Sequence, residues 1–313
     1  MMGSGNLEAK QTVFVAGGSG GLGKAVAKLV ASRGSHMAIF GRRIDVLEGA
    51  RNEIQQLARS SSQEINAVAV NELFKAQARI PDALYCAGGG NHAQNGFLVD
   101  ITANQLEACM KNNYYGTLYP IKSLVDIWIE DDRKNAQQES SLPKLRQVVI
   151  ISSAAAFVAL PGSIAYTPDK VAARALADTL RLEFLRYSCP SSTYSVHCAF
   201  PGDFISPGFY LEQHTKTPLT KRMQGTNSYP SSDKFALLII GAVDDGKFII
   251  CKDSISASLL FTSMTGPSPK RGLGIMDSLV GLLVNWFVWS ALRLRWEALC
   301  KKDGEEWRQK RVC

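Results

Sequence analysis

The stretch Thr12-Val-Phe-Val-Ala-Gly-Gly-Ser-Gly-Gly-Leu-Gly23 begins with apolar residues and ends in a run of glycines. After it, apolar residues recur at helical spacing through Val26, Leu29 and Val30 until Gly34. This order predicts a strand, a glycine turn and a helix. Glycines permit a close backbone approach, and the first amides of the helix would point toward a phosphate above the turn. The stretch therefore predicts the first unit of a dinucleotide-binding domain.

Strand and helix patterns alternate after this unit. Further apolar strands are expected at 37–40, 66–70, 83–86, 148–151, 196–200 and 247–251. Strands that are apolar throughout indicate a parallel sheet covered by helices on both faces. We therefore expect an α/β fold with a doubly wound parallel sheet over residues 11–255. The polar residues 1–10 lack the apolar core of a signal peptide and are expected to be a disordered N-terminus.

Two connections in this pattern are unusual. Residues 71–81 form a short link between two strands, and a parallel crossover needs at least about ten residues. A helix at 71–79 would fit with almost no loop, so this crossover is either shortened or missing a loop. Residues 203–229, rich in Pro, Gly, Thr and Lys, follow a central strand and are interpreted as a substrate lid. The polar residues 130–144 are expected to form an exposed extension or loop.

Composition excludes several classes of protein. The net charge is +7 over 313 residues, without a long basic tract that contains aromatics, so no nucleic-acid partner is expected. The seven cysteines are scattered and form no C-x-x-C pair. They are interpreted as reduced thiols, which argues against a disulfide scaffold and against a metal site and favours a cytosolic catalytic region.

Three side chains have the chemistry and spacing of a carbonyl-reducing site. Tyr166 and Lys170 are four apart, so a helix would place the phenol and the ammonium on one face. Ser153 lies 13 residues before Tyr166, at the end of the apolar run at 148–151. Taken alone, a Tyr and a Lys at this spacing are more often a surface pair. Together with Ser153 and the glycine turn, they favour catalysis.

The strand at 37–40 ends in Gly41-Arg42-Arg43, where a binder of NAD would usually carry a carboxylate for the ribose hydroxyls. Guanidinium groups match a 2′-phosphate, so Arg42, and with less support Arg43, favour NADPH over NADH. The alternative for both arginines is a solvated loop.

With these motifs in this order, residues 10–255 resemble the short-chain dehydrogenase/reductase family, which implies a Rossmann-type fold. The family's glycine pattern falls on residues 16–23, with Ala16 in place of the usual threonine. Its Asn-x-x-Gly element falls on Asn113 and Gly116, and Pro201-Gly202 matches the loop beside the nicotinamide. Tyr85-Cys86-Ala87-Gly88 departs from the family's Asn-Asn-Ala-Gly, and the aspartate usual after the third strand has no clear counterpart.

The resemblance implies roles for individual residues. Tyr166 would donate a proton to the carbonyl oxygen, Ser153 would orient the carbonyl, and Asn113 would hold a water that leads to Lys170. We expect Lys170 to lower the pKa of the Tyr166 phenol, and Asp169 to be a solvated helix residue. The implied cofactor-binding residues are Gly17, Ser19, Gly20, Gly21, Leu22, Gly23, Arg42, Arg43, Ala87, Gly88, Tyr166, Lys170, Pro201, Gly202, Phe204 and Ile205.

Within the family, the segments 200–209, 217–221 and 246–250 are similar to 3-ketodihydrosphingosine reductases of fungal type. This implies NADPH-dependent reduction of the 3-keto group of 3-ketodihydrosphingosine (3-ketosphinganine) to dihydrosphingosine in sphingolipid synthesis. The site would face the cytosol at the endoplasmic reticulum membrane. A reductase of another lipophilic ketone, of the steroid or retinoid type, is the first alternative. A non-catalytic membrane scaffold that senses NADPH is the second.

The C-terminal segment, 256–313, contains an apolar stretch. Residues 278–292 carry no charge, but a spanning helix needs about 20 residues, and a longer stretch would include Asp277. Arginines and lysines follow, as expected beside anionic lipid. We therefore expect a membrane-associating helix at about 273–294; a helix buried in an oligomer interface is the alternative. Whether this helix spans the membrane or lies on it stays open, and a homo-oligomer is expected.

Overall fold

The computed structural model describes residues 11–69, 79–90, 94–135, 143–225, 228–251, 270 and 273–312, with side chains up to residue 306. Three predictions lie outside the described residues: the disordered N-terminus at 1–10, most of the crossover helix at 71–79, and the start of the C-terminal segment at 256–269.

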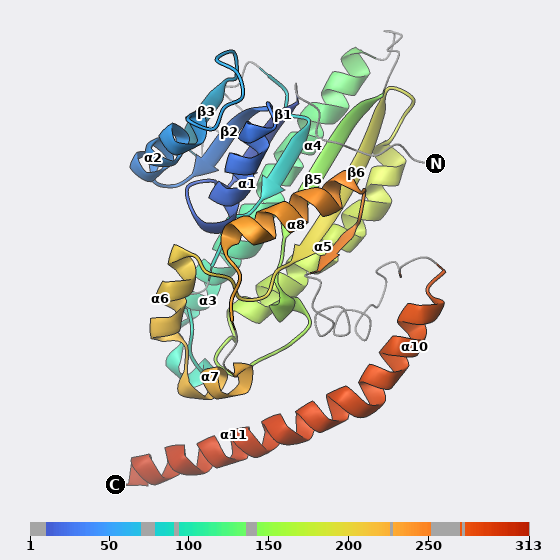
Figure 1. Cartoon of the computed structure of the whole chain (residues 1–313). Helices are drawn as coiled ribbons and strands as arrows, with labels where there is room; N and C mark the ends of the chain where they lie inside the picture. Colours follow the sequence, from blue (N-terminus) through green and yellow to red (C-terminus); the bar gives the residue numbers. More distant parts are fainter. Residues whose placement is uncertain are drawn as a thin grey trace.

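Seven parallel strands form one sheet in the order β3-β2-β1-β4-β5-β6-β7 (Figure 1). The strands are β1 (Thr12–Ala16), β2 (His36–Gly41), β3 (Ile65–Ala69), β4 (Ala83–Cys86), β5 (Lys144–Ile151), β6 (Ser192–Phe200) and β7 (Ile249–Cys251). Because every strand runs the same way, all carboxyl ends meet at one edge. The predicted doubly wound parallel sheet is confirmed.

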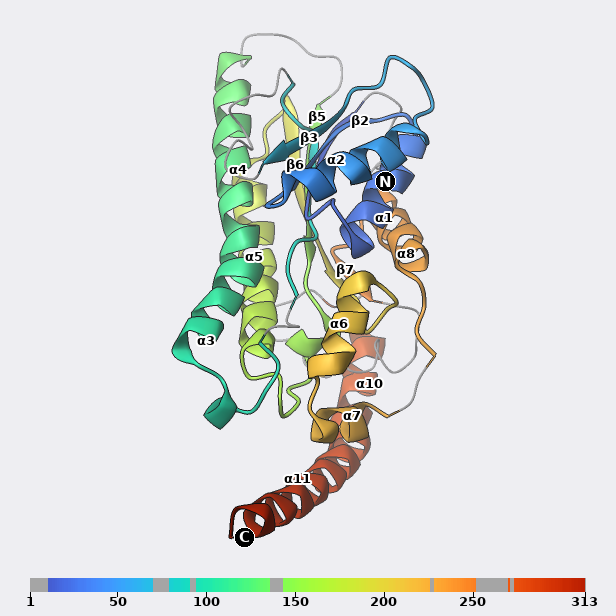
Figure 2. The ribbon, with the colours of Figure 1, turned by 90° about the vertical axis from the view of Figure 1, so that its left-hand side faces the viewer.

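Helices cover both faces of this sheet (Figure 2). Successive side chains of a strand alternate between faces, so Val13 and Val15 enter one core cluster and Phe14 enters the other. The first cluster is completed by α1 (Gly21–Ser32), α2 (Ile44–Gln55) and α8 (Ser232–Asp244). The second is completed by α4 (Gly116–Lys134) and α5 (Tyr166–Tyr187).

The helix before α4 is continuous with it. Thr102 caps α3 (Ala103–Met110) by accepting from the backbone N–H of Gln105, and the Oε1 of Gln105 accepts in turn from the backbone N–H of Thr102. A π-helical turn, Lys111–Tyr115, then joins α3 directly to α4. α3 and α4 are therefore one helix with a widened turn.

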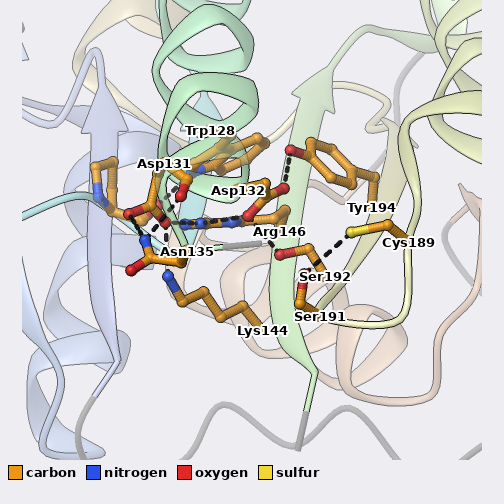
Figure 3. Close-up of polar contacts among 11 residues, drawn as sticks. Trp128, Asp131, Asp132, Asn135, Lys144, Arg146, Cys189, Ser191, Ser192 and Tyr194 are labelled. Carbon is orange, nitrogen blue, oxygen red and sulfur yellow. Dashed lines mark hydrogen bonds and ion pairs between the residues drawn. The ribbon is translucent and has the colours of Figure 1, made fainter. Parts of the chain in front are cut away.

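The expected exposed segment at 130–144 is exposed at both of its ends, Glu130 and Lys144, but Asp131 and Asp132 are partly buried, and residues 136–142 lie outside the described residues. α4 continues to Lys134, and β5 begins at Lys144. The reason for the partial burial is an ion network at the amino-terminal edge of the sheet, where Arg146 pairs with Asp131 and Asp132 (Figure 3). Pairing offsets the free-energy cost of burying these charges. The polarity of the sequence does not show which charges are paired.

The predicted lid at 203–229 contains two short helices, α6 (Pro207–Thr215) and α7 (Pro218–Gln224). Each begins with a proline after a capping residue, Ser206 or Thr217. Lys216, between the two helices, is buried and pairs with Asp203 at 3.5 Å and Glu212 at 2.9 Å. The described part of 203–229 thus forms two helices on the carboxyl side of the sheet.

A long helix closes the chain as α10 (Ile275–Leu283), a π-helical turn (Val284–Val288) and α11 (Trp289–Val312). It extends well beyond the predicted limits of 273–294. Its part from Ile275 to Glu306 is long and apolar enough to cross a membrane. Figures 1 and 2 place this helix on the same side of the molecule as the lid.

Candidate active site

The glycine turn after β1 packs against the loop after β4, backbone to backbone. Gly17 has φ +82, and a Cβ on it would lie 2.5 Å from the Cα of Gly88. A side chain at Gly17 would therefore be strained by conformation and by contact. The turn is also fixed to β2, because the N–H of Gly17 donates to the carbonyl of Phe40 at 2.8 Å. This packing positions the start of α1 at the carboxyl edge.

The start of α1 fits the pyrophosphate of a dinucleotide. Its N-cap, Gly20, provides no side-chain cap, and its first turn carries no acidic residue. A Cβ on Gly20 would meet nothing within 4 Å, so the space above this terminus is open. The first amides of the helix point into that space, with a partial positive charge. The predicted Leu22 differs in one respect: its side chain is buried in the core, so its backbone N–H is the group that faces a phosphate.

Two arginines follow β2, as predicted. Both Arg42 and Arg43 are exposed, and the Nη1 of Arg42 donates to Oδ1 of Asn112 at 2.9 Å. Arg42 thereby extends from the end of β2 toward the π-helical turn. Arg43 is the N-cap residue of α2 and makes no side-chain cap. The position of Arg42 fits a 2′-phosphate on the ribose held at the end of β2.

The three predicted catalytic side chains come together at the carboxyl edge. Tyr166 is the first residue of α5, and the Nζ of Lys170 lies 5.4 Å from the centre of its ring. Ser153 lies two residues after the end of β5, and a hydrogen bond joins its hydroxyl to Tyr166. The Ser153 hydroxyl also accepts from the N–H of Ala155 at 3.1 Å, which fixes its position.

The loop after β6 lies beside this group. Ala154 donates its N–H to the carbonyl of Pro201 at 2.9 Å, which ties the loop to the residue after Ser153. Further along, the ring of Phe204 packs on Phe235, and the N–H of Ile205 donates to the carbonyl of Pro230 at 2.8 Å. These contacts place residues 201–205 near the predicted nicotinamide position. Because the side chain of Phe204 packs against the core, we assign it no contact with the cofactor.

Burial shifts the pKa values of the two central groups. Burial lowers the pKa of Lys170 to about 8, against the opposing effect of the Asp169 charge. Burial raises the pKa of Tyr166, and the hydrogen bond to Ser153 offsets only part of this rise. The structure therefore gives Tyr166 a raised pKa, where a lowering by Lys170 was expected. A neutral phenol is nevertheless the form that a proton donor to a ketone requires.

Asn113 is buried within the π-helical turn, and its side-chain amide is fully engaged. Its Nδ2 lies 3.1 Å from the carbonyl of Gly90 and 3.2 Å from Oδ2 of Asp169, and its Oδ1 accepts from the N–H of Gly90 at 3.0 Å. A Cβ on Gly89 would lie 2.4 Å from this Oδ1. The amide thus fastens the loop after β4; the water at Asn113 stays a prediction.

Asp169 was expected to be solvated, and this was wrong. It is 1% exposed, and its carboxylate binds the amide of Asn113 and the thiol of Cys109. Burial raises its pKa, while these hydrogen bonds lower it. The sequence contained a signal for this: Asp169 lies three residues after Tyr166, on the face of α5 that also carries Ala173 and Ala177 in the core. A carboxylate therefore stands behind the catalytic group.

Comparisons with known proteins identify the family of the chain. The family model for short chain dehydrogenases matches residues 11–206. A 3-ketodihydrosphingosine reductase of Aspergillus fumigatus is 27% identical over 297 residues, which cover 87% of this chain and 79% of that protein. The 3-ketodihydrosphingosine reductase of Neurospora crassa is 26% identical, with 90% and 80% covered.

Solved structures show the same fold. A short-chain dehydrogenase from Sphingobium yanoikuyae in complex with NADPH superposes with a TM-score of 0.62 at 16% identity, covering 89% of this chain and 95% of that one. The predicted resemblance is confirmed, and with it the expectation of a nicotinamide cofactor. The chain belongs to the short-chain dehydrogenase family of NAD(P)-dependent oxidoreductases.

Proposed function

We propose that this chain reduces the 3-keto group of 3-ketodihydrosphingosine to dihydrosphingosine with NADPH. The observation that carries the proposal is the placement of Ser153, Tyr166 and Lys170 together at the carboxyl edge, beside the lid. The substrate class is supported by relatives that are named 3-ketodihydrosphingosine reductases and match nearly the whole chain. The exposed Arg42 supports NADPH over NADH.

The bound cofactor would supply hydride to the ketone carbon. Tyr166 donates its phenolic proton to the ketone oxygen, which would otherwise become an alkoxide. Its raised pKa keeps the phenol protonated at neutral pH until that moment. Ser153 hydrogen-bonds the same oxygen and stabilises the charge that develops on it.

Lys170 holds a positive charge beside the phenol once the proton has left. Its Nζ donates to the carbonyl of Ile151 at 3.1 Å, which fixes its position below the Tyr166 ring. Because the pKa of Lys170 is about 8 and thus close to neutral pH, its ammonium group can also release a proton. Asn113 positions the loop after β4 through its amide and does not act on the substrate.

The lid and the C-terminal helix fit a lipid substrate. Residues 203–229 lie beside the catalytic group, and α10 and α11 carry an exposed apolar surface on the same side. We place the enzyme at the endoplasmic reticulum membrane with its site toward the cytosol. A homo-oligomer stays a prediction.

The test is NADPH oxidation by the purified full chain with 3-ketosphinganine, a steroid ketone and retinal as separate substrates. We expect turnover with 3-ketosphinganine at least about tenfold above the others. If the enzyme preferred the steroid or retinal, the proposed substrate would be wrong, but the proposed NADPH-dependent reduction would stand. An absence of turnover with every ketone, despite NADPH binding, would support a cofactor-sensing protein instead.

The cofactor choice is tested by Arg42→Ala. A charge-assisted hydrogen bond contributes about 1.5 to 3 kcal/mol, so the KM for NADPH should rise about tenfold or more while the KM for NADH stays the same. The neighbouring Arg43→Ala is the matched control, with a smaller effect expected. If Arg42→Ala changed the KM for NADPH and the KM for NADH equally, Arg42 would not bind the 2′-phosphate.

A further inference from the structure

The C-terminal helix has two unlike faces. On one face Asp277, Gly281 and Val284 are buried, at spacings of four and three residues. This stripe continues through half-buried side chains into α11: Trp289, Leu292, Trp296 and Asp303. On the opposite face the apolar side chains of α10 and the π-helical turn are largely exposed: Leu279, Leu282, Leu283, Trp286 and Phe287. The helix thus turns one stripe inward and presents an apolar surface outward.

The inward stripe is fastened to the lid. α11 packs against α7, and the Nη2 of Arg222 on α7 lies 2.5 Å from Oδ1 of Asp303 on α11. α7 in turn contacts the segment that leads into α5, because the buried hydroxyl of Thr220 donates to the carbonyl of Pro161 at 2.5 Å. Pro161 lies five residues before Tyr166. A continuous set of contacts therefore joins the C-terminal helix, the lid and the catalytic segment.

The chain path argues against a single crossing of a bilayer. β7 ends at Cys251 within the sheet, and Asp303 contacts α7 of the same catalytic domain. One crossing between these two residues would put them on opposite sides. A second crossing would need another apolar run, but the longest uncharged run within 252–272 is residues 254–269, which include seven Ser or Thr and two Pro. About 20 apolar residues are required to span. The helix therefore lies along a surface.

Charge distribution identifies that surface. Asp277 is the sole acidic residue of 273–292, and it lies on the buried stripe with 3% exposed. Exposed cations follow the apolar surface at Arg293, Arg295, Lys301 and Lys302, with Glu297 and Glu305 as the exposed acids of that part of α11. An apolar face with tryptophan, followed by an excess of cations, matches the headgroup region of an anionic bilayer.

We propose that α10 and α11 lie in the plane of an anionic membrane, with Leu279, Leu283 and Phe287 inserted and with the opposite face holding the lid helix α7. Membrane binding and the lid then form one unit, so a lipid ketone passes from the bilayer to Tyr166 beneath α7. The identity of that ketone rests on the proposed function, whereas the membrane contact does not.

The membrane contact is tested by flotation of the full chain with phosphatidylcholine vesicles that contain or lack phosphatidylinositol. We expect stronger binding to the anionic vesicles, and Phe287→Glu should lower that binding at least about tenfold, since an inserted aromatic side chain would be replaced by a charge. Leu57→Glu, an exposed leucine at the end of α2, is the matched control and should bind as wild type does. Equal binding of Phe287→Glu would overturn the proposal, as would a lipid-free dimer that Phe287→Glu dissociates.

The in-plane orientation is tested in microsomes with glycosylation acceptor sites. One acceptor is inserted at residue 270 and another is added after Cys313, in separate full chains. Neither should be glycosylated if the helix lies in the plane at the cytosolic side. Glycosylation of one of the two would show a crossing and overturn the orientation. A lumenal acceptor on a fused secreted domain provides the positive control.

The link to the lid is tested with Arg222→Asp, Asp303→Arg and the double exchange. Each single variant should keep vesicle binding, but the stimulation of turnover by vesicles for a membrane-embedded ketone should fall about threefold, which is the scale of a partly exposed ion pair. The double exchange should restore it. The stimulation is measured for each variant as the ratio of turnover with vesicles to turnover without them. Unchanged stimulation in both single variants would overturn the link.

These experiments separate failure of this proposal from failure of the proposed function. Flotation and glycosylation need no substrate, so they remain informative if 3-ketosphinganine is not reduced. If 3-ketosphinganine is reduced but Phe287→Glu floats as wild type does, the catalytic proposal stands and the membrane face is wrong.

Discussion

Two buried groups of charged side chains lie at opposite edges of the same sheet, and they differ in how their charges are paired. At the amino-terminal edge Arg146 is 2% exposed and pairs with Asp131 and Asp132, beneath the ring of Trp128 (Figure 3). At the carboxyl edge Lys170 is 5% exposed and donates to a backbone carbonyl, that of Ile151.

The pKa values follow this difference. Asp131 is partly buried, which alone would raise its pKa, but hydrogen bonds from Lys144 and Arg146 hold it below the ordinary value. Lys170 is pushed the other way, because burial lowers its pKa to about 8. A buried group that is paired with opposite charges keeps its charge and stabilises the fold, whereas a buried charge without such pairing exchanges a proton more readily. The comparison teaches that burial alone does not mark an active site; incomplete pairing does.

The largest expected effect on activity is that of Tyr166→Phe at the carboxyl edge, compared with Tyr194→Phe at the amino-terminal edge. Tyr166→Phe removes the proposed proton donor, so kcat/KM for the ketone should fall about 10² to 10⁴-fold, the usual worth of general acid catalysis. NADPH binding, followed by its fluorescence, should persist. The control is Tyr194→Phe, which loses a hydrogen bond to Asp132 at 2.5 Å and should cost about 1 to 2 kcal/mol of stability with normal turnover. Normal turnover in Tyr166→Phe would refute its catalytic role.

Arg146→Met should destabilise the fold by about 3 to 5 kcal/mol, because Asp131 and Asp132 would stay partly buried without their partner. Urea unfolding measures this. Lys144→Met is the matched control: its ion pair with Asp131 at 2.7 Å is more exposed and should contribute less than about 1 kcal/mol. If both variants lost the same stability, the buried pairing of Arg146 would stabilise the fold no more than the exposed pair of Lys144 does.

Lys170→Met should do the opposite and stabilise the fold at neutral pH while ending turnover. The pKa of Lys170 is about 8 in the folded chain, against an ordinary value of 10.5. Below pH 8 both states are protonated and the fold bears the whole cost of the buried charge; between about 8 and 10.5 the folded state loses its proton first, so wild-type stability rises with pH. The gain for Lys170→Met at pH 7 is about 2 kcal/mol after the lost hydrogen bond to Ile151 is subtracted.

Unfolding of both proteins by urea at pH 7 and pH 10 checks this prediction. The difference between Lys170→Met and wild type should shrink at the higher pH. A variant that is less stable than wild type at pH 7 would show that Lys170 is as well compensated as Arg146, and the contrast between the two edges would fail.

Asp169→Asn should have the smallest effect. The Asp169 charge raises the pKa of Lys170, so its removal should lower that pKa further and move the alkaline limb of the kcat/KM profile to lower pH by about one unit. The control is Glu183→Gln, on the exposed side of the same helix, which should leave the profile unchanged. If the profile of Asp169→Asn did not move, the Asp169 charge would not affect the pKa of Lys170, and the role of the carboxylate would be limited to holding Asn113.

The sequence predicts the carboxyl edge better than the amino-terminal edge, for a physical reason. The glycine turn and the spacing of Tyr166 and Lys170 are short-range patterns, because backbone geometry and helical period set them locally. Ser153 joins them because a strand end and a helix start meet at one edge. The pairing of Arg146 with Asp131 and Asp132 depends on two elements packing together, and polar residues in sequence indicate exposure until that packing is known.

The same reason explains the errors within the site. Asp169 was assigned to solvent from its polarity, although its helical position beside Lys170 pointed inward. The lid helices α6 and α7 were missed because proline and glycine suggest loops, although Pro207 and Pro218 each stand at a helix start.

The π-helical turn at 111–115 makes the site sensitive to chain length rather than to side-chain chemistry. Cys109, Asn113 and Thr117 are all buried, at successive intervals of four residues along α3, the π-helical turn and the start of α4. Deleting one exposed residue here, such as Lys111, would return the helix to its ordinary period and rotate Asn113 about 100° relative to α4. The loop after β4 would lose its anchor even though no inward side chain had been replaced. Insertions and deletions, more than substitutions, therefore limit how this stretch can vary.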